Sequence, residues 1–236
     1  MRSCLIQLMV AVVLVFALLW FGLPFGASWL ATNALNAVGF TGTNTQVQVS
    51  ADLPPRILLG HADRVRLTSS QVSVGDLHAA SIDLTLSDVE FIDRTVGGVS
   101  GTLTGVRVPA QSGGVLTVDS AVLDGSGTDS TATLTVSNDQ VAGLAKTELK
   151  AAGVTATNVK LAAPDKVTIT VGGQTKTGHI VAHDGALEAV FTGVTPSTMT
   201  LIEAGNGNPF TFTSVAVGAS SVTLVGTIDF QSLLGL

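Results

Sequence analysis

The alternation of apolar and polar residues is clearest between Ala51 and Phe91, where two long segments carry an apolar residue at every second position. The alternating residues are Val65 and Leu67 in the first segment, and Ile82, Leu84 and Leu86 in the second. A period of two residues is typical of a half-buried β-strand. We therefore predict two long strands. A short helical turn from Pro55 to Gly60, begun by proline and closed by glycine, should precede them.

Each of these two segments changes the parity of its apolar positions once. In the first segment odd positions give way to even ones across Ser69-Ser70, and in the second even positions give way to odd ones across Ser87-Asp88. One extra residue turns every later side chain to the other face of a sheet, so we predict a β-bulge at each change. Bent strands of this kind suit a curved sheet that wraps a groove.

The rest of the folded part predicts more strands, separated by glycine-rich turns in the manner of an antiparallel meander. The expected strands are Val47–Leu53, Val99–Val108, Val115–Leu123, Thr131–Val136, Val154–Leu161, Val167–Val171, His179–Val181, Leu187–Phe191, Phe210–Val217 and Val222–Phe230. We expect hairpin turns at Gly172-Gly173 and Asp184-Gly185, and a further change of parity at Ser214. A loop from Gly42 to Thr45 should precede the first strand.

One segment changes to a helical period. Ser137-Asn138-Asp139-Gln140 has the order of a capping box, and an apolar stripe follows it up to Gly153. The stripe consists of Val141, Leu144, Ala145, Leu149 and Ala152. This predicts a helix of about 15 residues lying on the sheet. One helix covers only part of a sheet, so a second layer or a bound ligand must cover the rest of the apolar face.

The chain begins with a long apolar segment. From Cys4 to Phe25 it has 22 nearly uninterrupted apolar positions, flanked by Arg2. At about 1.5 Å per residue a helix of this length spans roughly 33 Å, enough for a bilayer core of about 30 Å. The segment is either a cleaved signal peptide or a transmembrane anchor, and its length favours the anchor. Both alternatives place the folded part outside the cytoplasm. We expect residues 1–26 to be this leader, residues 27–43 an interfacial helix and linker, and residues 44–236 one domain.

Composition narrows the classes of function. Charged residues make up 12% of the 236 residues and hydrophobic ones 46%, with a formal net charge of −6. This chain is too apolar for disorder and has the wrong sign of charge for nucleic-acid binding. Its single cysteine, Cys4, lies in the leader, so the folded part has no disulfide and no cysteine-based metal site.

Candidate catalytic groups are few. The G-x-S-x-G nucleophile motif is absent, and Gly125-Ser126-Gly127 is better explained as a turn. The histidines are His61, His78, His179 and His183, of which the last two are four residues apart and flank an expected hairpin. We expect the charged residues Arg64, Arg66, Asp83, Asp88 and Arg94 to lie on the outer face of the sheet. We therefore assign no catalytic residue, no metal and no cofactor.

Two halves of the chain carry a family resemblance. The sequences LPPRILLG and RVRLTSSQVSVGDLHAASIDLTLSDVEF, followed later by KVTITVGG, HDGALEAVF and NPFTFTSVAVGASSVTLVGTIDF, resemble the LmeA-like phospholipid-binding proteins of the actinobacterial cell envelope. The resemblance covers roughly residues 44–236. It implies an α+β, mostly β fold of the BPI-like, TULIP type, in which a highly curved antiparallel sheet wraps a long helix as a half-barrel. It also implies a groove for acyl chains, and a family member is associated with phospholipase activity.

The expected groove combines the apolar faces of these elements. The candidate lining residues are Ile57, Leu58, Leu59, Val65, Leu67, Ile82, Leu84, Leu86, Val141, Leu144, Leu149, Phe210 and Phe212. For Ile57, Leu58 and Leu59, packing in the core is favoured over contact with a membrane.

Three functions are consistent with the sequence. The first is an extracytoplasmic phospholipid-binding protein that holds acyl chains in an apolar groove, either anchored to the membrane or secreted. The second is a phospholipase, which needs the same groove and an activated nucleophile. The third is a structural or adhesive envelope domain without a ligand. The expected partners are a phospholipid or another acyl lipid, and the membrane through the N-terminal helix.

Overall fold

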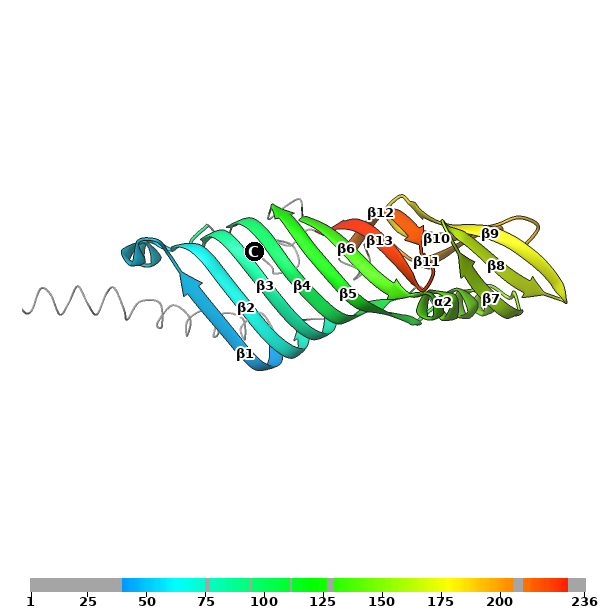
Figure 1. Cartoon of the computed structure of the whole chain (residues 1–236), viewed down its shortest axis with the longest axis horizontal. Coiled ribbons are helices and arrows are strands. Elements are labelled where there is room, and N and C mark those ends of the chain that lie inside the picture. The colour runs from blue at the N-terminus through cyan, green and yellow to red at the C-terminus, as the bar shows by residue number, and fades with distance from the viewer. Residues whose placement is uncertain are drawn as a thin grey trace, which may run out of the picture.

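A computed structural model describes residues 40–74, 77–93, 95–110, 112–126, 130–205 and 210–228 of the chain (Figure 1). These residues form thirteen strands, the 3-10 helix η1 and the α-helix α2, arranged in two antiparallel sheets. No helix within these ranges is long and apolar enough to cross a membrane. The predicted leader and interfacial helix lie outside the described residues.

The larger sheet has eight strands in the order β1-β2-β3-β4-β5-β6-β13-β12. Their bounds are β1 Thr41–Ser50, β2 His61–Val74, β3 Leu77–Glu90, β4 Thr95–Pro109, β5 Val115–Ser126, β6 Ser130–Ser137, β12 Phe210–Val217 and β13 Ser221–Ile228. The predicted meander is confirmed from β2 to β6, because each strand pairs with the next one in sequence. Between β1 and β2 lies η1, Pro54–Leu59, which ends at Gly60 in the left-handed conformation, as its proline and glycine predict.

The smaller sheet has five strands in the order β11-β10-β9-β8-β7. Their bounds are β7 Ala156–Ala162, β8 Lys166–Val171, β9 Gln174–His183, β10 Ala186–Phe191 and β11 Thr198–Ile202. Both predicted hairpin turns are confirmed. Gly172 and Gly173 join β8 to β9, and Asp184 and Gly185 join β9 to β10, all four with positive φ as a two-residue turn requires.

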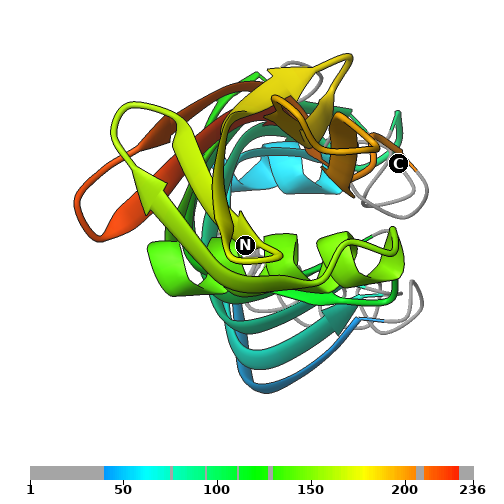
Figure 2. The same ribbon diagram turned by 90° about the vertical axis from the view of Figure 1, so that its right-hand side faces the viewer.

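Helix α2, Asn138–Ala151, packs at one end of the larger sheet, between it and the smaller sheet (Figures 1 and 2). The Ser137 side chain accepts a hydrogen bond from the Gln140 amide, so the predicted N-cap is confirmed. The helix contacts β5, β6 and β13 of the larger sheet and β7 and β11 of the smaller one. The opposite end of the larger sheet, β1 to β4, packs strand on strand and against η1.

Two lines of kinks cross the larger sheet where the sequence changes parity. The first line joins Gln71, Ala80, Gly105 and Asp119, which lie opposite one another in β2 to β5, with φ of 50° at Gln71 and 59° at Gly105. The strands keep the same register on both sides of this line. Buried positions therefore change parity in all four strands together, as in β5, where Leu116 and Val118 give way to Ala121 and Leu123.

The second line joins Asp63, Asp88 and Gly97, with φ of 49° at Asp88. The predicted change of face across Ser69-Ser70 and Ser87-Asp88 is confirmed by the burial of Val72 and Val89. The predicted bulge at Ser87-Asp88 is wrong, whereas near Ser69-Ser70 the register of β2 against β1 does shift, on both sides of the Thr43–Ser70 pair. From β2 to β5 neighbouring strands kink in step, so none of these strands gains a residue over the next one. At Ser214 the register of β12 against β13 does shift, so that strand carries a true bulge.

The expected fold class is wrong in two respects. The resemblance implied a long helix wrapped by a half-barrel, but α2 has 14 residues and covers one end of the sheet. Instead of a single sheet there are two, since β7 to β11 form a separate layer over that end. The expected N-terminal transmembrane or signal helix is not among the described helices. In addition, β1 starts at Thr41, so Gly42–Thr45 belong to a strand and not to a loop.

Candidate functional site

Of the predicted groove residues whose side chains are described, all except Leu59 belong to, or pack against, one hydrophobic core. Val65, Leu67, Ile82, Leu84 and Leu86 share the inner face of β2 and β3. At the other end, α2 contributes Val141, Leu144 and Leu149, and β12 contributes Phe210 and Phe212 with ring centroids 6.5 Å apart. Ile57 packs against the core, whereas Leu59 is 74% exposed, and the Leu58 side chain lies outside the described part.

Between the two lines of kinks, the apolar residues on the inner face of β1 to β4, here called the apolar wall, are Val47, Val49, Val65, Leu67, Ile82, Leu84, Leu86, Val99 and Leu103. Ser69, opposite Ile82, adds a buried hydroxyl to the same face. The ladders align these side chains in rows that continue onto the face under α2. One such row runs from Ile82 through Leu103 and Ala121 to Leu134 and Leu224. The apolar wall is therefore the uninterrupted extension of the packed core.

The opposite face of the same strands is polar. Two hollows open on it, one lined by Gln46, Gln48, Arg66 and Thr68, and the other by Arg64, Arg66, Asp83, Thr85 and Ser100 to Thr102. Arg66 bonds Asp83 with both branches of its guanidinium, at 3.0 and 2.8 Å, as expected for surface charges. Neither hollow is lined by a predicted groove residue, so the acyl-chain groove stays a prediction.

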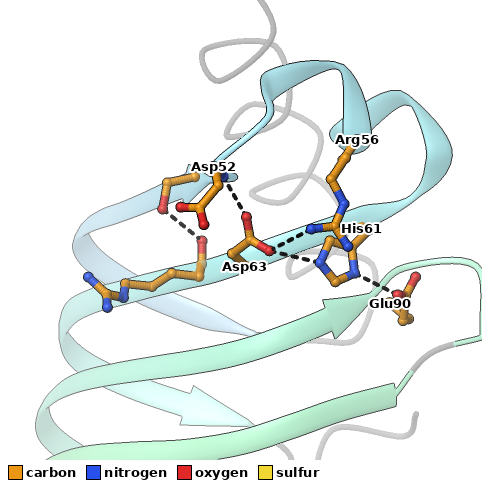
Figure 3. Close-up of polar contacts among 7 residues, drawn as sticks. Asp52, Arg56, His61, Asp63 and Glu90 are labelled. Carbon is orange, nitrogen blue, oxygen red and sulfur yellow. Dashed lines mark hydrogen bonds and ion pairs between the residues drawn. The ribbon is translucent and has the colours of Figure 1, made fainter.

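Where η1 meets β2 and β3, charged residues form an ionic cluster of Arg56, His61, Asp63 and Glu90 (Figure 3). His61 and Glu90 face each other across the β2–β3 ladder, and Nδ1 of the imidazole lies 2.6 Å from the Glu90 carboxylate. The second ring nitrogen, Nε2, lies 2.9 Å from Oδ1 of Asp63. Arg56 of η1 donates to the same oxygen at 3.2 Å, and the Asp52 amide donates to Oδ2. The ionic cluster thus links η1 to the first residues of β2 and to the last residue of β3.

These contacts favour the charged forms of both residues at the centre. Hydrogen bonds to Glu90 and then to Asp63 raise the pKa of His61 above its ordinary value of 6.5. The amide of Asp52, followed by His61, lowers the pKa of Asp63 below its ordinary value of 3.8. Because carboxylates occupy both ring nitrogens, His61 has no free nitrogen with which to activate a nucleophile.

A divalent cation is the one cofactor for which ligands converge among the described residues. His61, Asp63 and Asp88 offer ligand atoms within 4.8 Å of one another, and Glu90 on Nδ1 would orient the imidazole as carboxylates orient metal-bound histidines. Binding there requires Asp63 to release Arg56 and His61. The cluster is otherwise satisfied by its own ion pairs.

The remaining predicted residues stay apart from this cluster. His179 and His183 lie on the same strand, β9, so the prediction that they flank a hairpin is wrong. His179 pairs with Asp165 at 3.1 Å, and His183 lies 3.7 Å from Glu188. Ser126 ends β5, and its carbonyl accepts a hydrogen bond from Ser130, as suits a turn. His78 is exposed, and Arg94 lies outside the described residues.

Two polar contacts were missed from the sequence. Glu148 of α2 is buried and accepts hydrogen bonds from the amide and the hydroxyl of Ser112 in the β4–β5 turn. Its position in the helical stripe, between Ala145 and Leu149, could have indicated burial. The His61–Glu90 pair depends on the register of β2 and β3 over 29 residues, which no local pattern gives.

Searches for similar proteins found no matching family model, no matching curated protein and no matching solved structure. The resemblance to the LmeA-like family therefore stays a prediction.

Proposed function

We propose that the protein is an extracytoplasmic lipid-binding protein whose apolar wall holds the acyl chains of a phospholipid. The observation that carries this proposal is the uneven covering of a single apolar face. Among the described residues, helix α2 and the smaller sheet pack at the β5, β6, β13 and β12 end, whereas β1 to β3 contact their neighbouring strands and β2 also contacts η1.

Burial follows that division in part, since Val99 on β4 is only 2% exposed. Inward residues such as Leu67, Ile82 and Leu84 keep 5–9% of their surface accessible, while Leu123, Leu134 and Leu224 keep 0–1%. Each methylene transferred from water to such a face contributes about 0.8 kcal/mol, so an acyl chain gains by lying along it. Because the wall is aliphatic and lacks charged side chains, it selects chains by length and shape and not by headgroup.

The proposal can be tested in cells that produce the full chain and are fed a photoactivatable diazirine fatty acid. After irradiation, peptide mapping should place most crosslinks on inward positions of β2 and β3, such as Leu67 and Leu84. The matched outward positions in the same strands, Thr68 and Thr85, should stay largely unlabelled. Equal labelling of both faces, or none, would overturn the proposal and favour a structural envelope domain.

A phospholipase would use the same apolar wall. An assay of the chain purified from these cells distinguishes lipid binding from lipid hydrolysis. Release of fatty acid from phospholipid by the purified chain would make the protein an enzyme. We expect no release above that of a chain in which His61 is replaced by glutamine.

A further inference from the structure

Exposed apolar side chains gather at one end of the molecule. Among the described residues six large hydrophobic side chains are exposed, and four of them lie around η1 and the β3–β4 turn. This apolar tip consists of Leu53 at 57% exposure, Leu59 at 74%, Phe91 at 42% and Ile92 at 74%. The other two, Val115 and Val122, stand on β5. In Figure 1, η1 is at the far end of the larger sheet from α2.

Backbone contacts join the segments of the apolar tip. The Phe91 amide donates to the Gly60 carbonyl at 2.7 Å, which ties the β3–β4 turn to the end of η1. Ile92 lies directly over Gly60, since a Cβ there would come within 2.6 Å of Ile92 Cγ1. The Arg56 amide bonds the Leu53 carbonyl at 2.8 Å and holds the other end of η1. Four exposed apolar side chains from two segments far apart in the sequence therefore lie around η1.

The ionic cluster lies beneath this surface. Arg56 connects η1 to Asp63, and His61 connects Asp63 to Glu90, the residue just before Phe91. Both turns that carry the apolar tip are thus held by side-chain contacts as well as by the backbone. A surface fixed in this way loses little conformational entropy when it binds.

We propose that the apolar tip docks the protein onto a lipid bilayer whose surface carries no net charge. The size of the surface argues for a bilayer over a protein partner. Four partly exposed side chains offer a few hundred Å², about half of the ~800 Å² per partner of a stable protein interface. A bilayer needs no matching surface, because separate apolar side chains insert one by one.

The surrounding charge decides the kind of bilayer. Among the described residues near the apolar tip, the carboxylates of Asp52, Asp63, Asp88, Glu90 and Asp93 outnumber the cations Arg56 and His61. Anionic lipids would repel this excess negative charge, most strongly at low salt. Docking goes beyond the proposed function, because it requires nothing of the apolar wall.

The test uses the full chain with Cys4 replaced by serine, so that one new cysteine carries an environment-sensitive fluorophore. Labels go on Leu59→Cys or Ile92→Cys at the tip, and on Val122→Cys as a control of similar chemistry on β5. With phosphatidylcholine vesicles, quenching by spin-labelled lipid should be at least about threefold stronger at the tip positions than at position 122. Replacing a third of the lipid by phosphatidylglycerol should weaken quenching at the tip, and added salt should restore it.

Equal quenching at positions 59 and 122 would overturn the proposal, because residues outside the apolar tip would then account for any attachment. Stronger quenching with phosphatidylglycerol would overturn the choice of an uncharged surface. A fluorescence change at position 59 that depends on protein concentration and needs no vesicles would show a second copy of the chain as the occupant. Loss of tip quenching with retained acyl crosslinks on the wall would refute docking and leave the proposed function standing.

Discussion

Leu123, Leu134 and Leu224 lie under α2 at one end of the larger sheet, and Leu67, Ile82 and Leu84 lie on the apolar wall at the other end. The first three are at most 1% exposed and the second three are 5–9% exposed, although ladder pairing makes both groups part of one face. The alternation of apolar residues is equally regular at both ends. Alternation therefore specifies which side of a strand is apolar, and the covering element specifies how tightly that side is packed.

The two ends also differ in the contacts that hold their edges. At the covered end, α2 brings five buried side chains onto two sheets. At the other end, η1 is fastened by the ionic cluster and presents apolar residues to the outside. One end is stabilised mainly by packing, and the other depends more on exposed polar contacts.

Truncating a leucine at each end gives the largest contrast. Leu149→Ala in α2 should lower the free energy of unfolding by about 4 kcal/mol, because a fully buried side chain leaves a cavity that its neighbours fill poorly. Leu67→Ala on the apolar wall should cost about 2 kcal/mol, because the Leu67 side chain is partly accessible and its removal leaves a smaller cavity. Urea unfolding followed by circular dichroism measures both. Equal losses would show that the wall is packed as tightly as the core under α2.

The buried carboxylate of α2 tests whether polar contacts matter at the covered end. Glu148→Ala should cost about 1 kcal/mol, because the amide and hydroxyl of Ser112 lose their acceptor, although Ser112 is exposed and water can replace part of that contact. Glu148→Gln keeps one acceptor oxygen and should cost less. Lys146→Ala, on the exposed face of the same helix, serves as the control in the same unfolding assay and should have little effect. Alanine has a higher helix propensity than lysine or glutamate, so a loss at Lys146 as large as at Glu148 would show that the contacts to Ser112 add nothing beyond the truncation of a helix side chain.

The sequence predicted the elements better than their assembly. Alternation located twelve of the strands, and capping residues located both ends of α2, because these signals are local. Strand β11 was missed, since Thr198–Ile202 has only 5 residues and its alternation ends at the adjacent apolar residues Leu201 and Ile202. The division into two sheets was also missed. Nothing in the strands after α2 shows whether they extend the first sheet or stack on its end.

The kinks show the same limit on the scale of single residues. The changes of parity near Ser69 and Asp88 were visible, but a bulge and a shared kink leave the same trace in one strand. They are distinguished only by the register of the neighbouring strands, which is the same on both sides of Ala80. The apolar tip was only partly predicted, because Leu53, Phe91 and Ile92 join Leu59 through tertiary contacts.

Variants at Gly105 test whether the shared kink requires a glycine at this position of β4. Gly105→Ala should cost about 1–2 kcal/mol, because φ is 59° and the new Cβ would lie 2.8 Å from the Cβ of Ala80. Gly113→Ala has a similar positive φ with no atom near the new Cβ, and so measures the backbone strain alone. Adding Ala80→Gly to Gly105→Ala should restore the part of the lost stability by which Gly105→Ala exceeds Gly113→Ala. If it recovers nothing, crowding at the kink is not what Gly105 avoids.

The ionic cluster predicts a dependence of stability on pH that belongs to the η1 end alone. The pKa of His61 is raised in the folded protein by Glu90 and Asp63. Protonated His61 therefore contributes stability that is complete below its unfolded pKa of about 6.5 and is lost as pH rises through the folded pKa. The lowered pKa of Asp63 acts in the opposite sense, and its contribution is lost only when pH falls below its ordinary value of 3.8 through the folded pKa.

His61→Gln should accordingly lower the thermal midpoint most near pH 6, and its midpoint should approach that of the unmodified chain at alkaline pH. Arg56, Asp88 and Asp63 remain in the variant, so the pH dependence that these residues cause is present in both proteins and cancels in the comparison. His78→Gln changes an exposed histidine of β3 and provides the control. The measurement is a series of thermal unfolding curves between acid and alkaline pH for the three proteins. If the difference in thermal midpoint between the unmodified chain and His61→Gln stays constant over this range, His61 acts by packing and not by charge. The contrast between the two ends would then not include electrostatic stabilisation of η1.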